Sequence, residues 1–220
     1  MESTSISTPI ARSRTRSIAF VALTIAIMAV SAWVTIPIGP IPFTLQMFAI
    51  PFAIVVLSPK QAIAAIAGYL ILGAIGVPVF SGMRGGFGVL AGPTGGFLWG
   101  YIFGVVAAAF FLQFVRTHTN WDASRAELAR AAAQDPAAAA SLSMGARIVR
   151  FFRMAGVEVV AGVIFTALAY VCGCIQYMAL MNVGVEVAFM ACCAPFIVLD
   201  LIKIVAAVLC AQAVKGAVRA

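Results

Sequence analysis

Two ionisable residues, Asp200 and Lys203, lie inside the last apolar stretch of the sequence, which runs from residue 195 to residue 214. A charged side chain at the centre of a bilayer costs roughly 2.5–3.5 kcal/mol on insertion scales, so we expect this pair to have a compensating role. Their i, i+3 spacing places both side chains on one face of a helix. That face offers a carboxylate acceptor and an ammonium donor, which suits a small polar ligand with hydrogen-bond donors and a negative group.

The sequence contains no other set of residues that indicates catalysis. Its one histidine, His118, lies in a loop-like polar stretch on the side opposite Asp200, and neither an HExxH motif nor a P-loop ending is present. The five cysteines form no CxxC pair, and we interpret them as small apolar packing residues. We therefore predict a binding or transport protein that is not an enzyme and needs no metal or cofactor. Two alternatives stay open: a membrane enzyme with Asp200 as general base, and a structural scaffold.

The composition predicts an all-α, polytopic membrane protein. Of its 220 residues 64% are hydrophobic and only 10% are charged, whereas soluble domains average about 25% charged residues. The net charge of +7 comes mainly from residues that flank apolar stretches. We interpret this charge as an orientation signal rather than as a nucleic-acid surface.

We predict one integral membrane domain over residues 1–220 with six transmembrane helices. The predicted spans are roughly 17–36, 43–58, 60–77, 88–115, 154–180 and 195–215. Residues 116–153 are predicted to form a cytoplasmic linker with a short surface helix. The stretch 185–194 is predicted as a short helix or re-entrant segment before Pro195, and counting it as a span would give seven.

The basic residues predict that both termini are cytoplasmic. Of the 14 lysines and arginines, Lys203 lies within a span and Arg84 in an outer loop, and the other twelve fall in inner segments. The proline-rich turn near residue 40, the glycine-rich loop near residue 85 and the start of the last span then share the outer side. Arg84 is either a partner for a ligand carboxylate or an interfacial side chain.

Several motifs make the sequence resemble the BioY family, the biotin-specific substrate-binding (S) components of energy-coupling factor (ECF) vitamin transporters. They are IPIGPIPFTLQ at 36–46, LSPKQAIAAIAGYLILGAIGVPVFSG at 57–82, GGFGVLAGPTGGF at 85–97 and PFIVLDLIKIV at 195–205. The resemblance covers residues 17–115 and 154–215. The chain departs from the family pattern at Phe97, at Arg84, at Val198 and Leu199 before the aspartate, and in its long linker.

The resemblance implies a six-helix protein with an outward-side pocket for biotin. The residues that match the family's ligand site are Asp200, Lys203, Arg84, Gly85, Gly88, Gly95, Gly96, Phe43, Thr44 and Gln46. Ala22 and Ala26 match the small-residue motif with which S components dock a transmembrane coupling protein. The implied partners are biotin, the lipid bilayer, this coupling protein and ATPase subunits, with a homo-oligomer also considered.

The resemblance further implies high-affinity biotin uptake by the substrate-specific subunit of an ECF-type ABC transporter in a bacterial or archaeal cytoplasmic membrane. Asp200 would accept hydrogen bonds from the ureido N–H groups of biotin, and either Lys203 or Arg84 would pair with its carboxylate. Phe43 and Trp99 would pack against its rings. An S component for another vitamin and a stand-alone biotin transporter are the alternatives.

Overall fold

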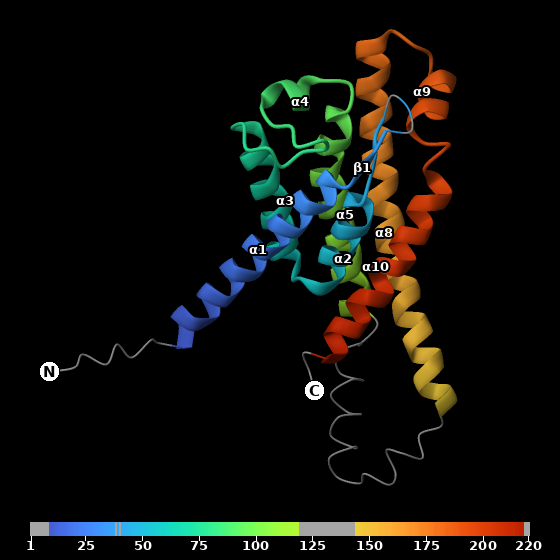
Figure 1. Cartoon of the computed structure of the whole chain (residues 1–220). Helices are drawn as coiled ribbons and strands as arrows, with labels where there is room; N and C mark the ends of the chain where they lie inside the picture. Colours follow the sequence, from blue (N-terminus) through green and yellow to red (C-terminus); the bar gives the residue numbers. More distant parts are fainter. Residues whose placement is uncertain (1–8, 38, 40, 119–143, 218–220) are drawn as a thin grey trace, which may run out of the picture.

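The computed structural model describes residues 9–37, 39, 41–118 and 144–217, and nearly all of this range is helical (Figure 1). The elements in chain order are α1 (Pro9–Trp33), β1 (Thr35–Ile36), β2 (Phe43–Thr44), α2 (Gln46–Val56), α3 (Pro59–Ala74), α4 (Phe87–Ala91), α5 (Gly95–His118), α8 (Met144–Met181), α9 (Val185–Cys192) and α10 (Ile197–Ala217).

Four of these helices are long and apolar enough to cross a bilayer, so the chain is a multi-pass membrane protein. Their apolar stretches are Arg14–Trp33, Gly95–His118, Arg153–Met181 and Ile197–Lys215. The other two predicted spans form α2 and α3, with 11 and 16 residues. At 1.5 Å per residue these reach only about 16 and 24 Å, against about 30 Å of hydrocarbon. The structure thus has helices at all six predicted places, but it does not establish six complete spans.

Proline and glycine set the boundaries that the sequence prediction placed wrongly. Residues 87–91 form the separate helix α4, and the chain breaks at Gly92 and Pro93 before α5 begins. The side chain of Gln176 in α8 donates to the backbone carbonyl oxygens of Leu90 and Gly92 at this break, at 2.9 and 2.7 Å. The predicted span 88–115 therefore starts at residue 95, because a proline cannot continue a helical hydrogen-bond ladder.

Two further segments differ from the prediction. The proline-rich turn contains a small antiparallel hairpin, in which Thr35 pairs with Thr44 and Ile36 with Phe43. Both ends of the predicted linker 116–153 are helical, since α5 continues to residue 118 and α8 begins at residue 144. The expected surface helix of the linker lies outside the described residues. The expected short helix before Pro195 is confirmed as α9.

Glycines bring α5 and α8 into close contact, and this pair forms the most extensive helix interface of the described chain. A side chain at Gly100 would place its Cβ 2.6 Å from the Cα of Ala169, and one at Gly104 would come within 2.7 Å of the Phe165 carbonyl oxygen. The small-residue stripe of α5 therefore serves internal packing.

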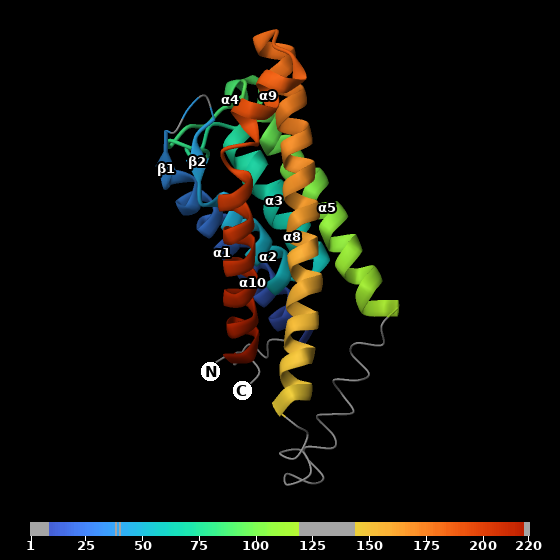
Figure 2. The same cartoon turned by 90° about the vertical axis from the view of Figure 1, so that its right-hand side faces the viewer.

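The two ends of the molecule differ in what they carry. The starts of α1 and α8 and the ends of α5 and α10 lie at one end, whereas the hairpin, α4 and α9 lie at the other (Figures 1 and 2). Near the first end, Lys215 of α10 binds Glu158 of α8 at 3.0 Å, and Gln212 also donates to this carboxylate. We call the end with the hairpin the loop end.

Candidate ligand-binding site

A cavity opens at the loop end, between the hairpin, the loop that precedes α4, and helices α5, α8 and α10. Residues from all these elements line it, although they are up to 162 positions apart in the sequence, from residue 41 to residue 203. The lining residues are Ile41, Pro42, Phe43, Thr44, Gln46, Met47, Phe80, Ser81, Arg84, Val89, Thr94, Phe97, Leu98, Tyr101, Tyr170, Cys192, Phe196, Asp200 and Lys203.

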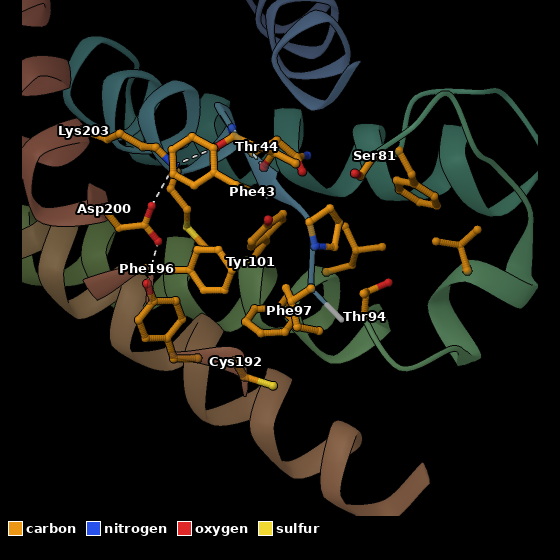
Figure 3. A pocket seen from close by; sticks show the side chains of 18 of the residues that line it. Phe43, Thr44, Ser81, Thr94, Phe97, Tyr101, Cys192, Phe196, Asp200 and Lys203 are labelled. Atoms are coloured by element: carbon orange, nitrogen blue, oxygen red, sulfur yellow. Dashed lines mark hydrogen bonds and ion pairs between the residues drawn. The ribbon is translucent and has the colours of Figure 1, made fainter. Parts of the chain in front are cut away.

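One wall of the cavity is polar and centres on Asp200. One carboxylate oxygen accepts a hydrogen bond from the Lys203 ammonium at 2.8 Å, and the other accepts one from the Tyr170 hydroxyl at 2.6 Å (Figure 3). Asp200 and Lys203 are only 4% and 9% exposed. Because a carboxylate offers about four lone-pair sites, Asp200 keeps acceptor capacity for a ligand.

Lys203 also links α10 to the hairpin. Its ammonium donates to the backbone carbonyl oxygen of Thr44 at 2.8 Å and lies 3.4 Å from the centre of the Phe43 ring. A cation over an aromatic face is attracted by the ring quadrupole. The ammonium is thus already engaged on three sides, so its structural role is to neutralise Asp200 and hold the hairpin against α10.

The remaining walls are largely aromatic. The Phe43 and Phe196 rings lie 6.4 Å apart with an interplanar angle of 22°, and Phe97 meets Tyr170 edge to face at 6.3 Å. Tyr101 also lines the cavity (Figure 3). Apolar surface with a few convergent polar groups is the usual character of a small-molecule site.

Gln46 and Arg84 reach the cavity in different settings. Gln46 is buried and donates at 2.6 Å to the Tyr69 hydroxyl, which in turn donates to the Val79 carbonyl oxygen at 2.8 Å. Arg84 is exposed, and its Nε donates to the Ser81 carbonyl oxygen at 3.1 Å. Arg84 therefore lies at the rim, in the loop that precedes α4.

The structure does not bring the four predicted glycines to the cavity: none of Gly85, Gly88, Gly95 and Gly96 is among its described lining residues. A Cβ at Gly85, Gly95 or Gly96 would collide with a backbone carbonyl of a neighbouring segment, so these positions serve close packing. A Cβ at Gly88 would meet nothing within 4 Å. Close packing at Gly85, Gly95 and Gly96 shapes the loop that carries Arg84 and the start of α5.

Two further sequence expectations fall outside the cavity. Trp99 is 41% exposed, and its indole nitrogen donates to the Leu90 carbonyl oxygen at 3.3 Å. Trp99, which was expected to pack against a ligand ring, is not among the described residues that line the cavity. Ala22 and Ala26 lie exposed on α1, next to Leu23 and Ile27, which are 57% and 41% exposed.

Sequence reasoning did not select Tyr170, Tyr101, Thr94, Cys192 and Phe196. A signal existed for Tyr170, since a hydroxyl inside an apolar span needs a hydrogen-bond partner in the absence of water. The same reasoning applies to Gln176. No such signal marks Cys192 or Phe196, whose place at the cavity depends on how α9 folds back.

Comparison with known proteins finds a matching family model and several relatives of this chain. The model of the BioY family matches residues 3–220. A biotin transporter BioY of Thermotoga maritima is 51% identical over 79 residues, which cover 36% of this chain and 47% of the relative. A probable biotin transporter BioY of Pyrococcus horikoshii is 44% identical over 85 residues, covering 39% and 52%. The chain thus aligns with about half the length of these relatives.

A solved structure shares the fold. The crystal structure of the S-component for biotin from an ECF-type ABC transporter aligns with a TM-score of 0.71, over 96% of this chain and 95% of that chain. The two sequences are 23% identical over this alignment, so the likeness concerns the fold.

Proposed function

The chain belongs to the BioY family, and from this premise we propose that it binds biotin in the cavity at the loop end and serves biotin uptake. Its named relatives are transporters, and the family is one of transport components rather than enzymes. This sets aside the alternative in which Asp200 acts as the general base of a membrane enzyme.

The observation that carries the proposal is the polar wall around Asp200 in an otherwise aromatic cavity. Biotin has a ureido ring with two N–H donors, an apolar thioether ring and a carboxylate at the end of an alkyl chain. Asp200, oriented by Lys203 and Tyr170, is suited to accept the ureido N–H bonds. The aromatic rings of Phe43 and Phe196 are suited to enclose the thioether ring.

The geometry favours Arg84 over Lys203 as the partner of the biotin carboxylate. Lys203 is engaged with Asp200, the Thr44 carbonyl oxygen and the Phe43 ring. Arg84 is exposed at the rim, where a carboxylate on a flexible chain would arrive, and a guanidinium binds carboxylates in bidentate fashion. Biotin would then lie with its ureido ring against α10 and its carboxylate towards the loop of residue 84.

The transport role extends the proposal. We place the loop end on the outer side of the cytoplasmic membrane and both termini in the cytoplasm, following the distribution of basic residues. The exposed Ala22 and Ala26 on α1 are suited to close helix contact with a transmembrane coupling protein, which would link the chain to ATPase subunits. Uptake by the chain alone is the alternative.

Titration calorimetry of the purified full-length chain with biotin and with a panel of other vitamins tests the ligand. We expect biotin to bind saturably and the other vitamins not to bind. Preferential binding of another vitamin would contradict the assignment of biotin as the ligand. For the carboxylate, R84Q should weaken biotin binding by about tenfold or more, as expected for loss of a charged hydrogen bond. The same variant should leave the binding of biotin amide unchanged.

R116Q is the matched control, because Arg116 lies in the last turn of α5 at the opposite end. An equal loss for biotin and its amide in R84Q would show that Arg84 does not read the carboxylate. For transport, uptake of labelled biotin is compared in biotin-requiring cells that express the chain with or without a coupling protein and ATPases. Full uptake by the chain alone would reject the dependence on an ECF module.

A further inference from the structure

Three cysteines gather where α8, α9 and the start of α10 meet at the loop end. Cys174 lies in α8, Cys192 ends α9, and Cys193 follows it directly. The sulfur atoms of Cys174 and Cys193 are 3.3 Å apart, and the Cys174 sulfur also lies 4.0 Å from the Ala188 carbonyl oxygen of α9. All five cysteines fall within the described ranges, and each is a free thiol in this structure.

We propose that Cys174 and Cys193 form a redox modification site, in which oxidation by a disulfide compound joins α8 to the segment between α9 and α10. A disulfide requires two sulfur atoms at about 2.0 Å. Because the two thiols already face each other at 3.3 Å, small side-chain rotations can close the remaining gap. Cys192 also lies within hydrogen-bond reach of Cys174, but its side chain is fully buried and lines the ligand cavity (Figure 3).

The exposure of the two thiols gives the order of the steps. Cys174 is half-buried, whereas Cys193 is 4% exposed. The Cys174 thiolate attacks one sulfur of the oxidant's disulfide, which forms a mixed disulfide and releases one thiolate. The Cys193 thiolate then attacks the Cys174 sulfur and displaces the second half of the oxidant. In total the protein loses two protons and two electrons, and the oxidant's disulfide is reduced to two thiols.

The bond would fix one wall of the cavity. Cys193 lies between Cys192 and Phe196, which both line the cavity, and α8 carries Tyr170. The cross-link closes a loop of about 20 residues and thereby restricts the unfolded chain. It should therefore raise the thermal midpoint of the protein and slow the exchange of a bound ligand. The proposed disulfide does not depend on which ligand the cavity binds. Its formation in an oxidising outer compartment rests on the proposed function, which places the loop end on the outer side of the membrane.

The test uses the purified, reduced full-length protein with excess oxidised glutathione, followed by alkylation under denaturing conditions and mass spectrometry. We expect the wild type to fall from five alkylated thiols to three, with one peptide cross-link between residues 174 and 193. C192S and C172S should lose two thiols in the same way. C193S should instead trap one glutathione on Cys174, because the resolving thiol is missing.

Thermal unfolding provides the second readout. Oxidation should raise the midpoint of the wild type and of C192S by about 5–10 °C, as expected for a closed loop of this size. The midpoint of C193S should not rise. Five remaining thiols in the oxidised wild type, or a cross-link from Cys174 to Cys192, would overturn the proposal.

Discussion

Replacing Lys203 by methionine tests how the polar wall works. The side chain keeps its length but loses the ammonium, which contacts the Asp200 carboxylate and the Thr44 carbonyl oxygen, each at 2.8 Å. Asp200 then remains a buried charge that keeps only the hydrogen bond from Tyr170 among the side chains that the structure describes. Breaking a buried ion pair from one side costs about 3–5 kcal/mol, so we expect a fall in the thermal midpoint of about 6 °C or more.

The same variant should lose biotin. Asp200 is no longer held in place, and the hairpin loses its link to α10, so we expect the affinity to fall by about 100-fold or more, equivalent to about 2.7 kcal/mol. The assays are thermal unfolding in lipid nanodiscs and titration calorimetry of the same preparation. K215M is the matched control, because it breaks the partly buried ion pair between Lys215, also on α10, and Glu158 of α8. It should lower stability but leave biotin affinity unchanged.

The double variant D200N/K203M separates the two roles of the pair. Replacing both charges by neutral side chains removes the unpaired buried carboxylate, so stability should recover towards the wild type. Biotin binding should stay lost, because the acceptor is gone. A K203M protein with wild-type stability and affinity would refute the reasoning, and so would recovery of biotin binding in the double variant.

Three further predictions concern other parts of the structure. Y170F removes the hydrogen bond to Asp200 but keeps the aromatic ring. Biotin should therefore bind about tenfold more weakly in calorimetry, with little change in thermal midpoint. An unchanged biotin affinity would contradict the role of the hydroxyl. G100A should destabilise the protein in thermal unfolding, because its Cβ would lie 2.6 Å from the backbone of α8, whereas G156A has open space and should be neutral or slightly stabilising. Tryptophan at both Ala22 and Ala26 should spare biotin binding and block co-purification with a coupling protein, and intact assembly would reject the docking role.

Long apolar stretches along the chain predicted where the main helices lie. Long apolar stretches give spanning helices because a bilayer leaves backbone groups no partner except their own helix. Proline at Pro59 correctly marked the start of α3. The same type of signal failed at residues 87–94, where the apolar composition continued across a break that Pro93 imposes and Gln176 of a distant helix satisfies. Composition also did not give the length of α2, which ends after 11 residues.

The sequence by itself determined that Asp200 and Lys203 share one face of the last helix, since their i, i+3 spacing is a local property of that helix. It also determined the membrane environment and, through its motifs, the family. The tertiary structure alone decided that Tyr170, Thr44 and Phe43 complete this pair, and that Arg84 lies at the rim of the same cavity. These contacts join residues 30 to 160 positions apart in the sequence. Their geometry depends on the close approach of helices and the folding back of loops, which no spacing within a single element specifies.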